Sequence, residues 1–399
     1  MTSTWKSCRW GDIATLEYGK ALRDYQDGVG EFPVYGTNGR IGWHESALTD
    51  EPGVIVGRKG AYRGIHFSGR PFFVIDTAFY LKPKAGVDPR WAYYELLTKD
   101  INGMDTGSAI PSTTRQSFYA LPVQVPPPNE QRAIAGVLGA LDDKIELNRR
   151  MSETLSRFAF EYFRCAYWRS PDRGAWSEER LGEHLEVVRG LSYAGAGLTA
   201  DGLPLHNLNS IYEGGGYKRS GLKRYSGNFK ERHVVHAGDV IVANTDLTWN
   251  FEVIASPALI PGHYGVGGLF SHHLYRVRPK RSSPLTPALV YLMLLAGPLR
   301  REVAGYANGT TVNMLPQDAL ERPRFRVPSF ERAREIELLV TPLFARAEAA
   351  ETESETLAEL RDALLPKLIS GELRVRDAER RAEQARSLSP LAGRGRARP

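Results

Sequence analysis

Short polar loops bounded by glycine carry the residues of this chain whose chemistry suits the recognition of nucleic acid. "VYGTNGRIGWH" at Val34–His44 places Asn38 and Arg40 between glycines, and "GRKGAYRG" at Gly57–Gly64 brings cations and a tyrosine together. Arginine reads guanine through two parallel hydrogen bonds, asparagine reads adenine in the same way, and lysine binds phosphates. The candidates in the second loop are Arg58, Lys59, Tyr62 and Arg63.

Similar segments occur in the second half of the chain. "HNLNS", "YKRSGLKRYS" and "ANTD" combine amides and cations, beginning at His206, Tyr217 and Ala243. Two hydroxyl-rich turns, at Thr106–Ser117 and Asn308–Asp318, offer hydroxyl and N–H groups that suit phosphate contacts. The candidates from these segments are Ser108, Thr114, Arg115, Asn207, Lys218, Arg219, Asn244, Thr310, Thr311 and Asn313. An ordinary polar turn is the alternative interpretation of each segment.

Motifs for catalysis and metal binding are missing from the sequence. No phosphate-binding G-x-x-x-x-G-K-[ST] loop is present, and no glycine-rich turn marks a dinucleotide or methyl-donor site. "VPPPNEQ" has its prolines in the wrong setting for the Asn/Asp-Pro-Pro-aromatic motif of amino-methylating enzymes. The histidines lack the spacing of a metal-binding helix. We therefore expect no catalytic residue, no metal and no bound cofactor in this chain.

Composition favours a globular protein with two or more domains. The chain has 399 residues, 42% hydrophobic and 25% charged, and a length of this kind exceeds one ordinary core. Two distant cysteines and the absence of a secretion signal or apolar span favour a cytoplasmic location. The net charge is +6, but residues 374–399 hold eight arginines against three acidic residues and are expected to be disordered. DNA binding elsewhere must therefore depend on the distribution of charge.

A repeat with a fixed offset indicates a duplicated domain. "SETL" stands at Ser152–Leu155 and again at Ser354–Leu357, 202 residues later, and the same offset places "VQVP" on "FRVP". Near the start of each copy, "GDIATLEYGKAL" at Gly11 resembles "GEHLEVVRGLSY" at Gly182, at an offset of 171. The second copy thus has 31 extra residues between these landmarks. A period of this length is typical of a domain duplication and not of a solenoid.

Each copy is expected to contain short strands followed by a helix. The expected elements are strands within 53–67 and 72–83, a helix at 89–100, strands within 237–246 and 272–279, and a helix at 286–305. A long segment with a helical apolar repeat then closes each copy.

These closing segments carry one apolar stripe each. The first stripe runs from Ile134 to Tyr162 and includes Phe158, and the second runs from Ile336 to Leu368. Packing the two stripes together as a coiled coil buries both, with separate docking of each helix on its own domain as the alternative. Pro342 is expected to kink or restart the second helix. The predicted seam residues are Ile134, Leu141, Ile145, Asn148, Leu155, Ile336, Leu343, Leu357 and Leu364.

This arrangement resembles the DNA-specificity subunit of type I restriction–modification systems. The resemblance rests on "GSAIPSTTRQSFYALPVQVPPPNEQRAIAGVLGALDDKIELNRRMSETL" in the first copy and on "LLPKLISGEL" at the end of the second. It covers residues 5 to about 373, although the second copy has "PSFERAREI" in place of the "PPxxEQ" core.

The resemblance implies an α+β fold. Two mixed α/β target-recognition domains are joined by two long helices packed as an antiparallel coiled coil. The implied boundaries are 1–126 and 171–328 for the recognition domains, 127–170 and 329–373 for the helical spacers, and 374–399 for the basic tail. Each domain reads one half of a split, asymmetric site, so the loop candidates above and Asn313 would read bases. The other turn candidates would bind phosphates: Ser108, Thr114, Arg115, Thr310 and Thr311.

The resemblance also implies partners outside this chain. Two methyltransferase subunits, which modify adenine at N6 with S-adenosylmethionine, would dock on the helices, and motor/nuclease subunits would add restriction that depends on ATP and Mg. The chain itself would bind double-stranded DNA at the nucleoid and would not be an enzyme. Two alternatives stay open: a coiled-coil-linked pair of modules for non-DNA ligands, and a single-chain restriction or methylation enzyme, which the missing motifs disfavour.

Overall fold

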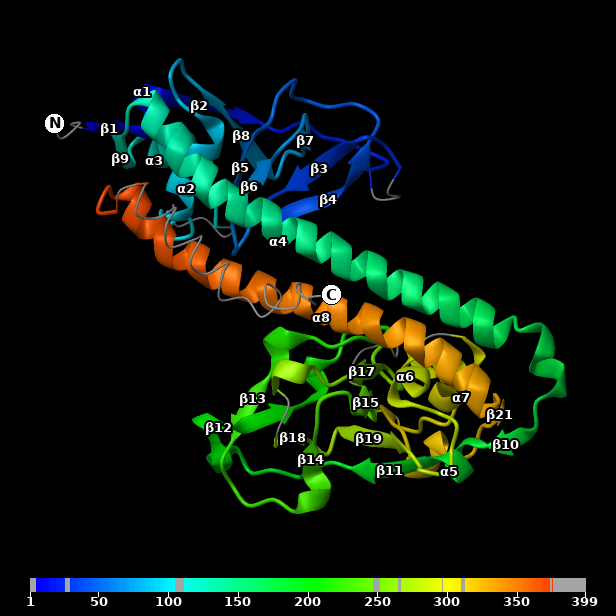
Figure 1. Ribbon diagram of the computed structural model, residues 1–399. Helices are drawn as coiled ribbons and strands as arrows, with labels where there is room; N and C mark the ends of the chain where they lie inside the picture. The colour runs from blue at the N-terminus through cyan, green and yellow to red at the C-terminus, as the bar shows by residue number, and fades with distance from the viewer. Residues whose placement is uncertain are drawn as a thin grey trace, which may run out of the picture. The chain divides into compact units, whose positions relative to one another are not determined.

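The computed structural model describes residues 5–25, 29–104, 111–246, 252–264, 267–295, 297–309, 313–373 and 375, without the side chain of His263. The chain divides into two compact units that both combine helices and strands (Figure 1). Unit 1 comprises residues 1–147 and 353–399, and unit 2 comprises residues 148–352. The two long helices, α4 (Pro128–Phe163) and α8 (Phe330–Ile369), therefore contribute one segment to each unit.

A four-stranded antiparallel sheet lies at the centre of unit 1. Its strands, in spatial order, are β2 (Ala14–Tyr18), β8 (Ala78–Pro83), β5 (Gly53–Gly57) and β6 (Ile65–Ser68). The β5 sequence "GVIVG" is buried along its whole length, as its β-branched residues favour. The other elements are the sheet β4 (Gly39–His44), β3 (Phe32–Gly36) and β7 (Phe73–Val74), the pair β1 (Lys6–Arg9) and β9 (Pro122–Val125), and helices α1 (Trp10–Ile13) and α3 (Arg115–Tyr119).

Helix α2 (Pro89–Leu97) packs against β5 and β6 in unit 1. Asp88 caps it by accepting hydrogen bonds from two backbone N–H groups of the first turn, both at 2.9 Å. Pro89 takes the first helical position, where no N–H donor is needed. The buried ring of Trp91 stacks on Trp10, with ring centroids 6.4 Å apart, and so joins the helix to the core.

Unit 2 repeats this arrangement with additional strands. Its central sheet has the order β11 (Leu185–Arg189), β19 (Leu274–Pro279), β15 (Val240–Ala243) and β17 (Pro257–Leu259). A second sheet contains β13 (Lys223–Tyr225), β12 (Leu198–His206), β18 (Gly268–Phe270) and β14 (Val234–Val235). Strands β12 and β18 run parallel, as β3 and β7 do in unit 1. The shorter elements are β10 (Glu178–Arg180) with β21 (Arg324–Arg326), β16 (Thr245–Asp246) with β20 (Asn313–Met314), and helices α5 (Leu181–His184), α6 (Pro287–Leu295) and α7 (Pro298–Gly305).

Matched hydrogen bonds relate the two units residue by residue. Thr113 N–H donates to the Arg58 carbonyl at 2.9 Å in unit 1, and Leu315 N–H donates to the Asn244 carbonyl at 2.7 Å in unit 2. Trp10 N–H donates to the Leu121 carbonyl in unit 1, as Leu181 N–H donates to the Pro323 carbonyl in unit 2. The Lys84 ammonium donates to the Gly11 carbonyl, as the Lys280 ammonium donates to the Gly182 carbonyl. The offset of 171 residues recurs at Trp10 and Leu181, and the offset of 202 residues recurs at Thr113 and Leu315. Arg58 and Asn244 are equivalent because they accept from these matched partners, Thr113 and Leu315.

The helix predicted over residues 286–305 is two helices in the structure, α6 and α7. Gly297 has a φ of +97°, a left-handed conformation that favours glycine, and Pro298 begins α7 directly after it. The prediction of one continuous helix is wrong because apolar periodicity does not detect a backbone break between two apolar segments.

The segments of α4 and α8 pack against each other inside each unit. In unit 1, Arg361 donates to Asp142 at 2.7 Å and Lys144 pairs with Glu353 at 3.0 Å. Rising residue numbers on α4 thus meet falling numbers on α8, so these two segments run antiparallel. In unit 2, α4 contributes the Ser152 hydroxyl, which donates to Glu351 of α8 at 2.7 Å.

The residues predicted for the helix seam lie on the covered faces of α4 and α8. Those that are fully buried are Ile134, Leu141, Asn148, Ile336, Leu357 and Leu364, and those that are half-buried are Ile145, Leu155 and Leu343. Phe158 is 55% exposed, whereas Ala159 and Phe163 are buried in its place. The buried face drifts by one residue along α4 because 3.6 residues per turn do not match a seven-residue repeat.

Helix α8 continues through Pro342, so the predicted restart at this residue is wrong. Proline removes one backbone N–H from the helical hydrogen bonds. Pro342 itself is exposed, and buried residues before and after it, Val340 and Ala347, hold both sides of the helix in the core. This packing offsets the lost hydrogen bond, since tertiary contacts supply most of the stability of a protein helix.

Protonation of His206, at the end of β12, is expected to destabilise unit 2 at acidic pH. Its side chain is 0% exposed and bonds to the Tyr217 hydroxyl at 2.8 Å, and burial lowers its pKa to about 3. The unfolded chain, with the ordinary pKa of 6.5, binds a proton below that pH whereas the folded chain does not. We expect the free energy of unfolding to fall by about 2 kcal/mol from pH 7 to pH 5 through this residue.

Urea unfolding at both pH values tests this expectation on the intact chain and on His206→Phe. The variant is expected to lose about 2 kcal/mol of the pH dependence, whatever its stability at pH 7. The same pH dependence in both proteins would contradict the role given to His206.

Candidate nucleic-acid interface

Two arginines contact one tyrosine ring at the end of the central sheet of unit 1. Tyr18 ends β2, Arg58 follows β5 and Arg115 begins α3. The guanidinium carbons of Arg58 and Arg115 lie 4.8 and 4.2 Å from the centre of the Tyr18 ring, which in turn lies 5.0 Å from the ring of Phe79. Such cation–ring contacts are favourable, and they hold both guanidinium groups on one half-exposed aromatic side chain. We call Tyr18, Arg58 and Arg115 the arginine–tyrosine cluster.

The loop after β5 is held by main-chain hydrogen bonds. The N–H groups of Arg58 and Lys59 donate to the Thr77 carbonyl at 3.0 and 3.2 Å, and Gly60 N–H donates to the Pro111 carbonyl at 3.0 Å. Lys59 is exposed on this fixed backbone. The ring of Tyr62, a little further along the same loop, is also exposed, at 78%. Both side chains are therefore available to a ligand that approaches the arginine–tyrosine cluster.

Arg63 belongs to the scaffold of this loop and not to its surface. Its side chain is 2% exposed and donates to the carbonyls of Gly60, Ile101 and Asn102 at 3.1, 3.2 and 2.7 Å. The prediction that Arg63 contacts DNA is wrong here, because its guanidinium is enclosed and bonded to the chain itself.

Replacing Arg63 by alanine is expected to lower the free energy of unfolding by about 2–3 kcal/mol, because three carbonyls lose a charged donor. Lys59→Ala, on the exposed side of the same loop, is the matched control and should change it by less than about 0.5 kcal/mol. Urea denaturation of the full chain measures both variants. Equal stability of the two would rule out the scaffold role of Arg63.

A second exposed cluster lies on the β3–β4 hairpin. Asn38 is exposed in the turn before Gly39, whose φ of +114° favours glycine. The guanidinium carbons of Arg40 and Arg70 lie 4.9 and 5.8 Å from the ring centre of Trp43. Asn38 and Arg40 thus remain accessible, as a residue that reads DNA must be.

Unit 2 has a polar cavity where unit 1 has the arginine–tyrosine cluster. Arg189 ends β11 as Tyr18 ends β2, and each pairs with an aromatic residue of the next strand, Tyr275 and Phe79. The cavity has a volume of about 340 Å³ and is lined by Arg189, Tyr275, Asn308, Met314, Leu315, Pro316 and Gln317. We call it the Arg189 cavity. Gln317 stands 202 residues after Arg115, so it replaces that arginine.

Arg189 gives the Arg189 cavity a positively charged lining group. Arg189 is exposed, and its Nε donates to the His272 carbonyl at 3.2 Å. Burial lowers the pKa of the neighbouring His273, and interactions with His272, Arg189 and Lys223 lower that pKa further. An exposed guanidinium beside a polar cavity suits a phosphate or an acceptor atom on a base edge.

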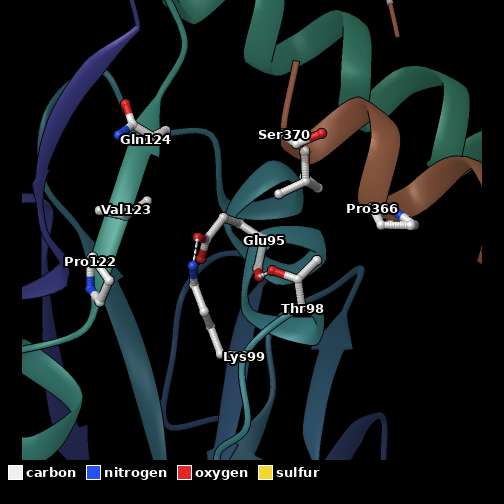
Figure 2. Close-up of a pocket in the computed structure, with 9 residues that line it drawn as sticks. Glu95, Thr98, Lys99, Pro122, Val123, Gln124, Pro366 and Ser370 are labelled. Atoms are coloured by element: carbon white, nitrogen blue, oxygen red, sulfur yellow. Dashed lines mark hydrogen bonds and ion pairs between the residues drawn. The ribbon is translucent and has the colours of Figure 1, made fainter. Parts of the chain in front are cut away.

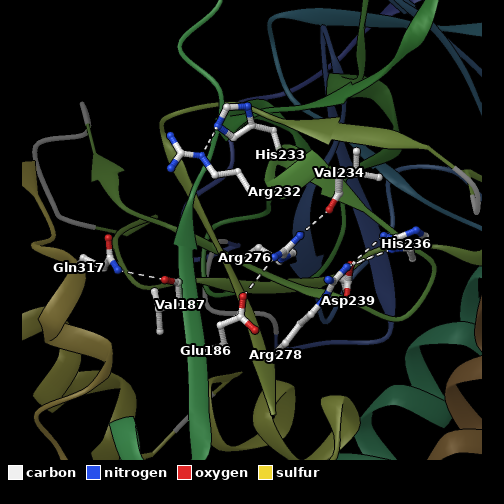
Figure 3. A network of polar contacts seen from close by, with 10 residues as sticks. All are labelled: Glu186, Val187, Arg232, His233, Val234, His236, Asp239, Arg276, Arg278 and Gln317. Atoms are coloured by element: carbon white, nitrogen blue, oxygen red, sulfur yellow. Dashed lines mark hydrogen bonds and ion pairs between the residues drawn. The ribbon is translucent and has the colours of Figure 1, made fainter. Parts of the chain in front are cut away.

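Several other cations of unit 2 are bonded internally (Figure 3). Buried Arg276 donates to the Val234 carbonyl at 2.6 Å and lies 3.6 Å from Glu186, and Arg278 pairs with Asp239 at 2.6 Å. The same view shows the Gln317 amide donating to the carbonyl of Val187 at 3.0 Å, which fixes it beside β11. Arg276 and Arg278 therefore support the sheet, and Gln317 is oriented by it.

A further cavity of about 370 Å³ in unit 1 is lined by both polar and apolar side chains, among them Glu95, Lys99, Val123 and Pro366 (Figure 2). Glu95, 2% exposed, pairs with Lys99 at 2.7 Å and accepts a hydrogen bond from the Trp10 indole at 2.9 Å. Burial raises the pKa of this carboxyl group. Because Glu95 and Lys99 pair with each other, the charged groups of this cavity offer little to a nucleic acid.

Comparison with known proteins identifies a matching family, a relative and a similar fold. Residues 2–157 match the family described as "Type I restriction modification DNA specificity domain". The chain is 25% identical over 331 residues to the "Type I restriction enzyme MjaIX specificity subunit" of Methanocaldococcus jannaschii, with 74% of this chain and 71% of that protein covered. The family match covers less than half of the chain, whereas the relative is similar over about three quarters of it. Its fold is similar to the crystal structure of the type I restriction–modification S subunit from M. genitalium, with a TM-score of 0.66, 16% identity and coverage of 92% and 96% of the two chains.

Two asparagines predicted to read bases are structural. Asn207, 5% exposed, accepts a hydrogen bond from Asn209 N–H at 2.9 Å and donates to the Gly221 carbonyl at 2.7 Å. Asn244, 1% exposed, donates to the His272 carbonyl at 3.0 Å. Both predictions are wrong because the amides are buried and bonded to the backbone.

Two further candidates have internal partners. Thr114 caps α3, where its hydroxyl oxygen accepts the Ser117 N–H at 3.1 Å. The Arg219 side chain is only 11% exposed and pairs with Glu351 at 3.2 Å, so the prediction that it reads bases is corrected. Thr114 thereby positions Arg115, which follows it at the start of α3.

Of the remaining candidates, Lys218 and Asn313 lie within the described residues and three others do not. Lys218 is half-buried, with its ammonium 5.8 Å from the ring centre of Tyr212, and half-buried Asn313 pairs with Asp246 in the ladder of β20 and β16. Both remain accessible in part. Ser108, Thr310 and Thr311 lie outside the described residues, as does most of the predicted tail.

Sequence reasoning missed Tyr18 and Arg189, although a signal for both was present. Each stands directly before a glycine of the repeated opening segment, Gly19 and Gly190. A Cβ at either glycine would lie 2.0 or 2.2 Å from a backbone carbonyl oxygen, so the glycine is required and the preceding position is equivalent in both units. Among the described residues, no group of His, Cys, Asp and Glu side chains is arranged to hold a metal ion, and no helix is long and apolar enough to cross a membrane.

Proposed function

We propose that this chain is the DNA-reading subunit of a type I restriction–modification complex, with each unit reading one half of a bipartite, asymmetric site. The observation that supports this most is the contrast between equivalent positions in the two units. The repeated scaffold carries the arginine–tyrosine cluster in unit 1 and the Arg189 cavity in unit 2. Because the scaffold is shared and the exposed groups differ, the two half-sites differ in sequence.

In unit 1 the contacts to bases come from two half-buried guanidinium groups and an exposed amide. Arg58 and Arg115 suit guanine, Asn38 suits adenine, and Lys59 suits the phosphate backbone. In unit 2 the accessible groups are Arg189, Gln317, Lys218 and Asn313. Glutamine reads adenine in the same way as asparagine.

The two long helices act as an antiparallel coiled-coil spacer in this proposal. Helix α4 has 36 residues, which corresponds to about 54 Å at 1.5 Å per residue. One turn of DNA is about 34–36 Å, so a helix of this length exceeds one turn. The helices thereby fix the number of base pairs between the two half-sites.

Catalysis is assigned to partner subunits. Two methyltransferase subunits that modify adenine at N6 bring S-adenosylmethionine, and motor/nuclease subunits, when present, bring the chemistry that needs ATP and Mg. Large apolar side chains on α4 and α8 are exposed and suit protein docking: Leu147, Phe158, Phe330 and Leu338.

Selection from a library of random DNA duplexes tests the proposal. The chain is purified together with the methyltransferase subunits that accompany it, and bound duplexes are sequenced. We expect two enriched blocks of different sequence, separated by a gap of constant length. A pair of modules for non-DNA ligands, the competing interpretation, predicts no enrichment, and that result would reject the proposed function.

A further inference from the structure

Arg219 joins the second sheet of unit 2 to helix α8. Its Nε donates to the Glu351 carboxylate at 3.2 Å, and a terminal nitrogen donates to the Glu348 carbonyl and the Thr352 hydroxyl at 3.4 and 3.3 Å. The Arg219 side chain is 11% exposed and that of Glu351 is 44% exposed, so only the arginine side of this ion pair is shielded from water. Glu351 also accepts the Ser152 hydroxyl of α4 at 2.7 Å, so Arg219 is connected to both helix segments of the unit.

The loop that carries this arginine is fixed to the sheet at its other end. Asn207 donates to the Gly221 carbonyl at 2.7 Å, and Lys218 N–H donates to the Ser210 carbonyl at 2.8 Å. A Cβ at Gly221 would lie 1.8 Å from a backbone carbonyl oxygen of the neighbouring turn, so the two turns touch directly. The loop therefore cannot move on α8 without moving the sheet that ends in β12 and β13.

Arg90 makes the corresponding connection in unit 1. Its guanidinium donates to the two carboxylate oxygens of Asp143 at 2.5 and 3.1 Å and to the Gly139 carbonyl at 3.1 Å. The absent side chain of Gly139 leaves the space that the guanidinium occupies. The next turn of α2 adds a second link, because the Tyr94 hydroxyl donates to Asp142 at 2.6 Å.

We infer that Arg90 and Arg219 are positioning residues that hold each recognition sheet on its long helix and so enforce the gap between the two half-sites. In both units one planar guanidinium binds a helix carboxylate and a helix carbonyl together. A contact at two points fixes direction as well as distance. The inference deepens the proposed function and rests on it.

Loss of the contact between either arginine and its long helix is expected to widen the range of gaps between half-sites that the protein accepts. A half-site displaced by one base pair is shifted by about 3.4 Å along the helix axis. A recognition sheet that can tilt on its helix is able to follow such a shift, whereas a clamped sheet is not. The residues that read the bases are other residues, so the sequence of both blocks stays the same.

The test repeats the duplex selection with Arg219→Ala in the full chain and its methyltransferase subunits. We expect Arg219→Ala to select the same two blocks as the unaltered chain. The fraction of selected duplexes whose gap is one base pair shorter or longer should rise by about ten-fold. Glu351→Gln removes the negative charge of the partner on the helix side and leaves a weaker, neutral acceptor, so it is expected to act in the same direction. Arg224→Ala is the control and should leave the distribution of gaps unchanged. Arg224 lies on the same hairpin, but it donates to the Gly202 carbonyl of the sheet at 3.1 Å.

An unchanged distribution of gaps in both Arg219→Ala and Glu351→Gln would overturn the inference. A changed base preference in either block would also overturn it, because Arg219 would then be a base reader. If the unaltered chain selects no pair of blocks, the proposed function itself fails. If the unaltered chain selects the two blocks and both variants show the same distribution of gaps as the unaltered chain, only the positioning role fails. The two failures are therefore distinct.

Discussion

Replacing Arg58 and Arg115 together by alanine is expected to lower the preference for one half-site about 100-fold and to leave the other half-site unchanged. One well-placed arginine–guanine contact contributes about 1–3 kcal/mol of discrimination, and each 1.4 kcal/mol is about ten-fold in affinity. Both arginines share the ring of Tyr18, so removing only one leaves the other in place. The measurement is competition between duplexes in which one block at a time is scrambled, at one salt concentration because phosphate contacts depend on salt.

A surface arginine outside the cluster provides the control for this double variant. Arg322 forms an exposed pair with Asp318 one helical turn away, and Arg322→Ala should leave the preference for both blocks unchanged. An equal loss of preference at both half-sites in the double variant would contradict the assignment of the arginine–tyrosine cluster to one half-site.

The largest loss of stability is expected for Trp10→Ala, about 3–5 kcal/mol in unit 1. The Trp10 ring is 0% exposed and lies 5.6 Å from the ring of Phe118. Its indole also donates to Glu95, so the variant opens a cavity and removes a donor from a buried carboxylate. Amide hydrogen exchange of the full chain measures the effect unit by unit.

Leu181 is the residue of unit 2 that stands 171 positions after Trp10, and it is 1% exposed. Leu181→Ala should therefore accelerate exchange in unit 2 by an amount equivalent to about 2–5 kcal/mol. Unchanged exchange in the strands of unit 1 after Trp10→Ala would show that this tryptophan is not central to its core.

Much of the fold follows from patterns that are local in the sequence. Strands β5 and β8 were predictable from β-branched and aromatic runs between glycine and proline, and α4 and α8 from apolar residues at helical spacing. The break between α6 and α7 depends on the backbone conformation of Gly297, and the continuity of α8 at Pro342 depends on burial of its flanks. Periodicity contains neither piece of information.

The site was less predictable because residue type does not reveal remote partners. Arg58 and Arg63 stand in the same glycine-bounded loop, but Arg63 meets carbonyls 38 and 39 residues away and is enclosed by them. Asn207 and Asn244 are buried for the same reason. Tyr18 and Arg189 are identified as site residues by their cross-strand neighbours, and these neighbours are known only once the strands are paired.

The central claim is that the chain specifies a bipartite DNA site with one half read by each unit. The measurement that tests it most directly is a genome-wide map of N6-methyladenine in the host, with this gene intact and with it deleted. We predict that deletion removes methylation from one motif, made of two different blocks at a constant gap. An identical methylation map in both strains would contradict the claim.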